Sequence, residues 1–411
     1  MRIAYLAQSY PPMISGAAIF VRDIAEAMAA GGHQVLVIAA SDIGRPYIVR
    51  CGNLKVVRLR SFHNPMRVGQ RVLPYPRNAI LRALRDFAPD IIHAHEPLIS
   101  WVGFEYAQRE NIPITLTMHM LPWFVSAFLP NVLKIRATAE SVGWMYVRLM
   151  TRKFTSVIST TKTTADVVTR MTGVQAKTIS CGINMQTFRP PLPSDPETAT
   201  RTRLGLPSDV PVILHVGRLD TEKRVERVVH AAAQAMGRSN AHLLIVGDGR
   251  EKAALIKLSR SLGIADRVHF PGFVSVENGL PEIYRVADLF VMASEVESQG
   301  IVLLEAAASG LPIVAVDATS ISEVVHDGVN GYLTNPGDVQ SFGEAIADLL
   351  QAPERSKQMG EESRGLAEKY DIRHTRDQHE QFYGKLIERN LHPQKKYARW
   401  KRVKTWLGIS K

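Results

Sequence analysis

The stretch that decides the fold runs from Ala287 to Ala318, "ADLFVMASEVESQGIVLLEAAASGLPIVAVDA". It starts as an apolar run typical of a buried strand, turns at Gly300, continues as a helical run over residues 301–308 and ends in a second apolar run. This succession predicts two parallel strands joined by a helix. Two carboxylates, Glu297 and Glu305, flank the helix start, where free backbone N–H groups favour an anion.

The same alternation extends outward through the chain. Strand-like runs include "RIAYLAQ", "QVLVIAA", "DIIHAHE" and "PITLTMH" in the first half, and "PVILHVGR", "HLLIVGDG" and "PIVAVDA" in the second. Nearly continuous apolar strands separated by helices indicate parallel sheets covered on both faces. The series restarts after "GINMQTFRPPLPSDPE", residues 182–197. We therefore predict an α/β protein with two doubly wound Rossmann-like domains, residues 1–185 and 196–373, and an interdomain cleft that binds ligands.

The composition is that of a globular protein. The chain has 411 residues, of which 45% are hydrophobic and 22% charged, which suffices for two cored domains. Two cysteines far apart, Cys51 and Cys181, indicate no disulfide framework and a reducing compartment. The first residues reach Pro11 too soon for a signal sequence, and no apolar run approaches the length of a membrane span. We expect a cytoplasmic protein.

Two strand ends in the second half carry residues suited to a ligand. "HVGRLDTEKR" places Arg218 and Lys223 after a strand, where two cations suit a diphosphate; surface residues at the head of a helix are the alternative. "GDGREKAAL" places Gly247 after another strand, where the chain turns sharply or approaches a ligand closely. In the first half, Gly16 precedes a helix and its backbone could face a phosphate, although the dinucleotide pattern G-x-G-x-x-G is missing.

A nucleotide sugar fits these residues better than any other ligand. Helix-start amides near Gln299, Gly300 and Ile301, together with the two cations, would hold its diphosphate. Carboxylates accept paired hydrogen bonds from vicinal hydroxyls, so Glu297 would bind the sugar and Glu305 the ribose. An ordinary solvated helix residue is the alternative for Glu305.

Several blocks resemble the retaining glycosyltransferases of GT-B architecture, family four. They are "GRLDTEKR", "GDG", "FPGFV", "SEVESQGIVLLEAAASGLPIVA" and "EVVHDGVNGYL", and the likeness extends to about Tyr383. The resemblance implies transfer of a sugar from a nucleoside diphosphate with retention at the anomeric carbon, without a metal or other cofactor. It implies that Arg218 and Lys223 stabilise the leaving diphosphate, while Glu297 contacts the donor sugar and Glu305 the ribose.

The resemblance also assigns residues outside the two acids and two cations. "FPGFV" adds Phe273 and Val274 to the donor contacts, and His119 in "TLTMHM" matches the family's histidine near the reacting carbon. A buried structural histidine is the alternative for His119. His93 and His95 in "DIIHAHEP" form an H-x-H pattern, but metal binding is not indicated without further spaced ligands.

Two features bear on mechanism and specificity. Glu297 lacks the partner acid that a glycosidase nucleophile would have, which favours front-side displacement assisted by the leaving phosphate. The chain departs from the family pattern at Gly16–Ala17, where paired glycines are common, and at Thr319–Ser320, where a small residue and a glycine are common. The first departure bears on how closely the backbone at Gly16 can approach a phosphate. The second bears on which acceptor or which nucleotide base the site selects.

Aromatic and basic residues gather on the expected acceptor side. They follow His119 directly and comprise Trp123, Phe124, Phe128, Trp144, Lys134, Arg136, Arg148, Arg152 and Lys153, with Arg67, Arg71 and Arg77 on an earlier loop. This combination suits a membrane interface rich in anionic lipid. A core helix pair with a solvated face is the alternative.

The C-terminal segment, residues 374–411, is expected to form helices that return to the N-terminal domain and end in a basic tail. The net charge is +11, and from Arg389 to Lys411 eight Lys and Arg residues occur without any Asp or Glu. Tyr397, Trp400, Val403 and Leu407 fall on one side of a helix, which suits insertion at an anionic membrane surface. Packing against the N-terminal domain, with the charges in water, is the alternative.

These features predict a membrane-peripheral enzyme at the inner face of the cell membrane. "SQG" after Glu297 resembles the bacterial diacylglycerol glucosyltransferases, which implies transfer of a hexose, glucose, from UDP-glucose to a lipid such as diacylglycerol. A lipid-linked or soluble oligosaccharide is the alternative acceptor, and a nucleotide-sugar epimerase is a minor option. A nucleic-acid-associated binding protein is the rival of another class, and the strand-end residues argue against nucleic acid as a partner.

Overall fold

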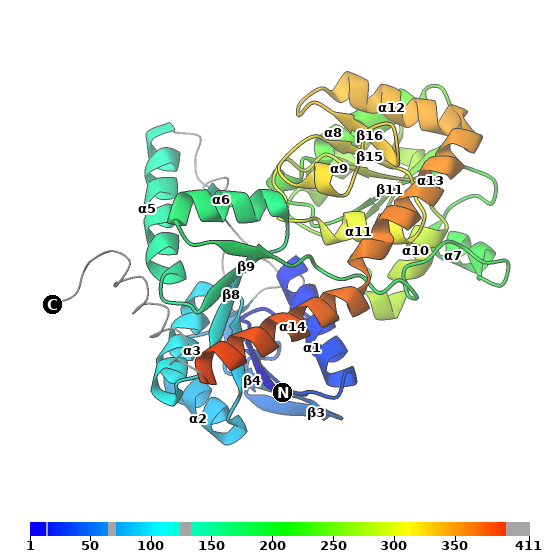
Figure 1. Cartoon of the computed structure of the whole chain (residues 1–411). Coiled ribbons are helices and arrows are strands. Elements are labelled where there is room, and N and C mark those ends of the chain that lie inside the picture. The colour runs from blue at the N-terminus through cyan, green and yellow to red at the C-terminus, as the bar shows by residue number, and fades with distance from the viewer. Residues whose placement is uncertain (14, 65–70, 120, 124–132, 392–411) are drawn as a thin grey trace.

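The chain folds into two α/β domains that lie side by side (Figure 1). The computed structural model describes residues 1–13, 15–64, 71–119, 121–123 and 133–391. Each domain has a central, mainly parallel sheet packed between helices. The predicted class, two doubly wound Rossmann-like domains, is confirmed.

Within these described residues, the N-terminal sheet has eight strands in the order β10-β9-β8-β7-β1-β2-β4-β3, and β3 at one edge runs antiparallel. The strands are β1 (Arg2–Leu6), β2 (Gln34–Ala40), β3 (Tyr47–Cys51), β4 (Leu54–Leu59), β7 (Ile91–Ala94), β8 (Ile114–Met118), β9 (Ser156–Ser159) and β10 (Ala176–Thr178). The helices are α1 (Gly16–Ala30), α2 (Arg77–Phe87), α3 (Pro97–Glu110), α5 (Leu133–Thr151) and α6 (Lys162–Thr172), and a small hairpin pairs β5 (Phe62–His63) with β6 (Arg71–Val72).

The C-terminal sheet, counted over the same part of the chain, has six parallel strands in the order β13-β12-β11-β14-β15-β16. They are β11 (Val212–Val216), β12 (His242–Val246), β13 (Val268–Gly272), β14 (Leu289–Met292), β15 (Ile313–Val316) and β16 (Gly331–Thr334). The helices are α7 (Glu197–Leu204), α8 (Val225–Met236), α9 (Lys252–Ser261), α10 (Leu280–Arg285), α11 (Ile301–Ala308), α12 (Val339–Gln351) and α13 (Pro353–Ala367). Short 3-10 turns are η1 (Thr221–Lys223), η2 (Ala265–Arg267), η3 (Val276–Asn278), η4 (Ile321–Glu323) and η5 (Glu368–Tyr370).

Burial on both faces explains the nearly continuous apolar strands. In β1, Ile3 and Tyr5 belong to the hydrophobic cluster on one face of the sheet, while Ala4 and Leu6 belong to the cluster on the other. All four are fully buried. A strand covered on both faces needs apolar residues at every position rather than at alternate ones.

The strand order predicts where ligands bind. In the C-terminal sheet the chain first builds outward from β11 to β12 and β13, and then reverses to add β14, β15 and β16 on the other side. Loops that follow two strands at such a reversal run in opposite directions, so a ligand-binding crevice is expected where the loops after β11 and β14 begin. The N-terminal sheet reverses in the same way between β1 and β7.

Two crossings that lie side by side join the domains. Ile183 in the first crossing donates its N–H to the Tyr370 carbonyl at 2.7 Å, and Ile372 donates its N–H to the Ile183 carbonyl at 2.9 Å. Beyond the second crossing, α14 (Ile372–Leu391) returns to the N-terminal domain and lies beside α1 (Figure 1). Its Tyr383 is fully buried there.

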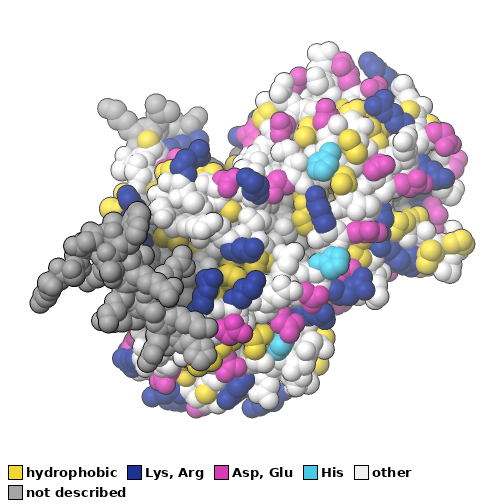
Figure 2. Space-filling view, in the orientation of Figure 1, with side chains coloured by type: hydrophobic (Ala, Val, Ile, Leu, Met, Phe, Trp, Pro, Cys, Tyr) yellow, Lys and Arg dark blue, Asp and Glu magenta, His cyan; other side chains and the backbone are white. Residues whose placement is uncertain are grey.

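Several residues of the predicted membrane surface lie outside the described residues. These are Arg67, Phe124, Phe128 and the tail from residue 393 onward. On the face shown in Figure 2, acidic and basic side chains are interspersed over both domains. No helix within the described ranges combines the length and the apolar character needed to cross a membrane.

Candidate active site

The loop that carries Glu297 follows β14 and ends at the start of α11. Gly300 is the N-cap of α11 and has φ 74°, a left-handed conformation in which a side chain would be strained. A Cβ at this position would also lie 3.0 Å from Leu303 Cδ1. The glycine therefore allows the tight turn that places Glu297 and the helix N–H groups at the same strand end.

The structure brings Lys223 and Glu297 together, although 74 positions separate them in the sequence. Lys223 Nζ donates to Glu297 Oε1 at 2.5 Å, and the two side chains are 19% and 11% exposed. Lys223 comes from the loop after β11 and Glu297 from the loop after β14, so the pair sits at the reversal of strand order. A pair this buried is sensitive to loss of either partner.

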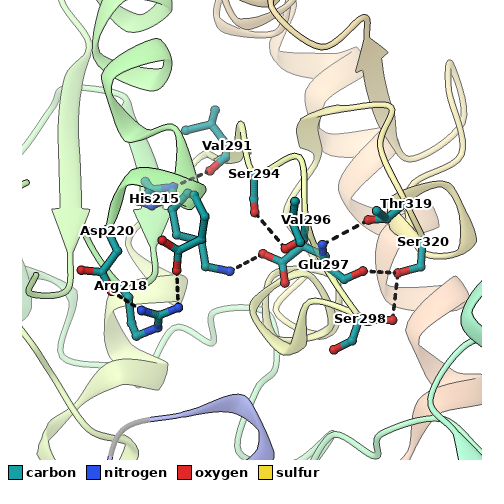
Figure 3. A network of polar contacts seen from close by, with 12 residues as sticks. His215, Arg218, Asp220, Val291, Ser294, Val296, Glu297, Ser298, Thr319 and Ser320 are labelled. Carbon is teal, nitrogen blue, oxygen red and sulfur yellow. Dashed lines mark hydrogen bonds and ion pairs between the residues drawn. The ribbon is translucent and has the colours of Figure 1, made fainter. Parts of the chain in front are cut away.

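The second cation, Arg218, is also paired. Its guanidinium donates to the carboxylate of Asp220 (Figure 3) and to that of Glu222, both within the same loop. These two acids were not among the predicted site residues, although they stand between Arg218 and Lys223 in "GRLDTEKR". Each predicted cation thus has a carboxylate partner in this structure.

His215 is a further residue that the sequence did not single out. It lies on β11, is buried, and its Nδ1 is 3.0 Å from the Val291 carbonyl on β14 (Figure 3). Burial lowers the pKa of His215 to about 4, so the ring is neutral at pH 7. It links the two strands whose ends carry the Lys223–Glu297 pair.

Glu305 is not a solvated helix residue, and that alternative was wrong. Glu305 lies on α11 and its side chain is buried. Tyr284 donates its hydroxyl to Glu305 Oε2 at 2.7 Å. Burial raises the pKa of Glu305 to about 7, with the Tyr284 hydrogen bond acting in the opposite direction. The sequence could not indicate this partner, because Tyr284 is 21 positions away on α10.

Gly247 and Gly16, the two predicted site glycines outside this loop, lie close to neighbouring segments of the chain. Gly247 has φ 147°, and a Cβ there would lie only 1.8 Å from the Gly217 carbonyl oxygen. This glycine therefore lets the β12 end pack against the loop that carries Arg218. A Cβ at Gly16, the first residue of α1, would lie 3.7 Å from Ile301 Cδ1, so the starts of α1 and α11 meet across the domain boundary.

Gln299, Phe273 and Val274 are the remaining residues predicted to contact the donor. Gln299 is buried, and its Oε1 accepts the N–H of Cys181 at 2.7 Å, which ties the loop to the first interdomain crossing. Phe273 is exposed and Val274 partly buried in the turn after β13.

His119 belongs to a cluster of buried histidines in the N-terminal domain. Its Nε2 is 2.9 Å from His95 Nδ1. His93 is hydrogen-bonded through both ring nitrogens, to Tyr383 on α14 and to Thr117, each at 2.6 Å. His379, also on α14, is fully buried, and its ring centroid lies 5.5 Å from that of His93 and 5.4 Å from that of Tyr383, with the ring planes tilted. Across the residues that the structure describes, no group of His, Cys, Asp or Glu side chains could hold a metal ion.

Protonation of this cluster is expected to destabilise the fold in acid. Burial lowers the pKa of His119 to about 4 and that of His379 to about 3. An unfolded histidine has a pKa of about 6.5. The neutral rings therefore contribute stability that is complete above pH 6.5 and lost as the pH falls toward the folded values, by up to about 1.4 kcal/mol per pH unit for each ring. Glu96 and Glu305, whose pKa burial raises to about 7, act in the opposite direction.

The contribution of one ring is isolated by comparing variants. The free energy of unfolding in urea is measured for His379→Leu and for the unchanged protein between pH 7 and pH 5. We expect the variant to gain stability relative to the unchanged protein as the pH falls, because leucine cannot be protonated. His230→Gln, at an exposed position on α8, serves as the control. A difference for His379→Leu that stays constant over this pH range would contradict the assignment.

Comparison with known proteins fits this geometry. The model described as "Glycosyltransferase Family 4" matches residues 14–187, and the model described as "Glycosyl transferases group 1" matches residues 196–366. Together they cover the two domains and both strand ends of the site. The chain belongs to the family 4 glycosyltransferases. It is therefore a GT-B glycosyltransferase, as the sequence blocks predicted.

The curated relatives of this glycosyltransferase differ in the acceptors that their names state. D-inositol 3-phosphate glycosyltransferase 2 of Catenulispora acidiphila is 33% identical over 66% of this chain and 65% of the relative's length. A D-inositol 3-phosphate glycosyltransferase of Xylanimonas cellulosilytica is 30% identical over 68% of each chain. The alpha-monoglucosyldiacylglycerol synthase of Acholeplasma laidlawii is 28% identical over 86% of this chain and 89% of its own length.

Solved structures share the fold of this glycosyltransferase. A sucrose-phosphate synthase from Thermosynechococcus elongatus superposes with a TM-score of 0.78 at 24% identity, over 94% of this chain and 99% of its own. HepE of Anabaena, solved in complex with UDP-glucose, superposes with a TM-score of 0.73 at 20% identity, over 94% of this chain and 100% of its own.

Proposed function

We propose that the chain transfers a hexose, glucose, from UDP-glucose to a membrane lipid such as diacylglycerol, with retention at the anomeric carbon and without a metal. The observation that carries the donor part is the Lys223–Glu297 pair beside Arg218 at the strand-order reversal. It offers cations for a diphosphate and a carboxylate for sugar hydroxyls within one crevice.

The proposed diphosphate site combines cations with helix ends. The start of α11 follows Gly300 directly, and the start of α1 at Gly16 approaches it from the other domain. Helix N-termini bind phosphates through free N–H groups and the helix dipole. Arg218 and Lys223 would exchange part of their contact with Asp220, Glu222 and Glu297 for phosphate oxygens. Glu305 would bind the ribose, with Gly247, Phe273, Val274 and Gln299 completing the donor contacts.

The proposed chemistry is a front-side displacement. The bond between the anomeric carbon and the phosphate oxygen breaks, and the acceptor oxygen bonds to the same face of that carbon. The acceptor hydroxyl proton passes to the leaving phosphate oxygen. Arg218 and Lys223 would stabilise the charge that develops on the diphosphate, Glu297 would hold the sugar, and His119 would lie near the reacting carbon.

The exposed face of α5 supports a membrane acceptor. Trp144 was predicted to lie on the membrane surface, but it is buried against the N-terminal domain together with Val147 and Met150, so that prediction was wrong for this residue. The opposite face carries four apolar side chains that are 48% to 59% exposed and spaced seven, three and four positions apart: Ile135, Val142, Met145 and Leu149. Basic side chains are exposed at the end of the helix and just beyond it: Arg148, Arg152 and Lys153. Exposed apolar residues beside basic ones suit an anionic lipid surface.

Similarity along most of the chain supports the choice of lipid and sugar. The relative named alpha-monoglucosyldiacylglycerol synthase matches 86% of this chain, which includes both domains. A soluble acceptor is the second candidate, because the relatives named for D-inositol 3-phosphate are slightly more identical, although they match only about two thirds of the chain.

An assay with separated phases tests the proposal. The protein is incubated with radiolabelled UDP-glucose, UDP-galactose or GDP-mannose, and with either a membrane lipid extract or D-inositol 3-phosphate. We expect label from UDP-glucose in the organic phase, increased by added diacylglycerol and unchanged by a chelator. Label that stays in an aqueous product would contradict the lipid acceptor, and activity that a chelator removes and a divalent cation restores would contradict the metal-free mechanism.

Membrane attachment is expected to require the basic tail and to be strengthened by α5. Each Lys or Arg near an anionic surface contributes about 1 kcal/mol, so deleting residues 393–411 should abolish sedimentation with anionic liposomes. Met145→Glu with Leu149→Glu should weaken it, and salt should weaken binding of the intact protein. Leu192→Glu, at a position that is 52% exposed in the interdomain crossing, is the control. Undiminished sedimentation of the truncated protein would contradict a role for the tail.

A further inference from the structure

The backbone of Glu297 is held from both sides by two hydroxyls that follow β15. Glu297 donates its N–H to Thr319 Oγ1 at 3.1 Å, and Ser320 Oγ donates to the Glu297 carbonyl at 3.1 Å (Figure 3). Ser320 Oγ also lies 2.9 Å from the carbonyl of Ser298. Thr319 and Ser320 form one of the two places at which the sequence departs from the family pattern.

Thr319 adopts a backbone conformation that its residue type disfavours. Its φ is 50°, in the left-handed region, where a β-branched residue is an outlier. Such a conformation persists only when surrounding contacts impose it, and such outliers cluster at functional sites. Thr319 is also exposed, so it is not held there by burial in the core. Its hydroxyl oxygen accepts the N–H of Glu297, which is a contact that can hold this conformation.

The N-terminal domain holds the same loop. Thr161, the N-cap of α6, donates its hydroxyl to the Ser298 carbonyl at 3.1 Å. Next to it, the N–H groups of Lys162 and Thr163 donate to the carboxylate of Glu323 in the C-terminal domain, at 3.0 and 2.7 Å. The Ser298 carbonyl therefore accepts hydrogen bonds from both domains.

We propose that Thr319, Ser320 and Thr161 are positioning residues that fix Glu297 against the donor sugar. The inference rests on the proposed role of Glu297. When Lys223 turns to a diphosphate, the Glu297 carboxylate loses its 2.5 Å partner, and the hydrogen bonds at its backbone remain to hold it. Small errors in the position of a group that binds the reacting sugar lower turnover strongly. Thr161 makes this position depend on contact between the two domains.

Single substitutions that remove one hydroxyl test the proposal. Thr319→Val keeps the branched shape and Ser320→Ala removes a hydroxyl that donates only to this loop. One net hydrogen bond corresponds to about 0.5–1.5 kcal/mol, or roughly a two- to tenfold loss of kcat. We expect that loss for Thr319→Val and Ser320→Ala, and at least that loss for Thr161→Val, whose hydroxyl also accepts the N–H of Thr164 as the N-cap of α6, with an unchanged Kd for UDP in all three. Thr319→Ser and Thr161→Ser should restore the rate, since both keep the hydroxyl.

Two comparisons separate positioning from general structural effects. Thr202→Val removes a hydroxyl on α7 that bonds within its own helix, and it should leave kcat unchanged. In the Glu297→Gln background, Thr319→Val and Ser320→Ala should cause little further loss, because they act through the acid. If Thr319→Val or Ser320→Ala lowers kcat as much in the Glu297→Gln background as in the unchanged protein, the proposal is overturned. It is also overturned if Glu297→Gln lowers kcat but Thr319→Val, Ser320→Ala and Thr161→Val all leave it unchanged. Full turnover of Glu297→Gln itself would instead refute the proposed role of Glu297.

Discussion

Glu297→Gln is expected to lower kcat by ten- to a hundredfold while UDP binds at least as tightly as before. The change keeps the shape of the side chain but removes the charge that would accept hydrogen bonds from the sugar hydroxyls, and a charge-assisted hydrogen bond contributes about 1.5–3 kcal/mol. It also frees Lys223 from its 2.5 Å partner, so the ammonium becomes more available to a diphosphate. Steady-state kinetics and calorimetric titration with UDP measure the two effects separately.

A control lies two residues earlier in the same loop. Glu295 is also paired with cations, Arg227 and Arg224, and Glu295→Gln removes an ion pair whose carboxylate is 29% exposed, against 11% for Glu297. We expect this control to retain most of its activity. Near-normal kcat for Glu297→Gln would contradict the sugar-binding assignment, and so would an equal loss for both variants.

Lys223→Ala is expected to weaken both steps, raising the Kd for UDP about ten- to a hundredfold and lowering kcat/KM by at least as much. The ammonium is proposed to contact the diphosphate in the bound donor and in the departing product, so its loss affects binding and catalysis alike. The variant also leaves Glu297 buried without its counter-charge, which should lower the thermal unfolding midpoint.

The exposed Lys162 provides the control for Lys223. Lys162 pairs with Asp166 on the surface of α6, and Lys162→Ala should change neither UDP binding nor the unfolding midpoint appreciably. If Lys223→Ala binds UDP as the unchanged protein does, the diphosphate is held elsewhere.

The fold could be predicted because the apolar runs and Pro-rich segments that determine its strands and domain boundary are each visible within a short stretch of sequence. Strands buried on both faces must be apolar throughout, and "RIAYLAQ" and "PIVAVDA" show this directly. The Pro-rich segment at residues 182–197 marked the restart of the series because it interrupts that pattern. The resemblance then named the architecture, and the two family models match each half of the chain.

The partners within the site could not be predicted, since they depend on the order of strands in space. Lys223 and Glu297 were expected to contact different parts of one ligand, but they pair with each other because β11 and β14 are neighbours in the sheet. Tyr284 reaches Glu305 from α10, and α14 covers the histidine cluster from the other end of the chain. Thr319 and Ser320 were noted only as departures from a pattern, and their hydroxyls contact Glu297 through the backbone.

A crystal structure of the chain with UDP tests the central claim most directly. The account predicts a diphosphate between the ends of β11 and β14, with Lys223 Nζ and the Arg218 guanidinium each within about 3.2 Å of a phosphate oxygen and the Glu297 carboxylate directed to where the sugar would lie. UDP bound outside this crevice, or phosphates that contact neither Lys223 nor Arg218, would contradict it.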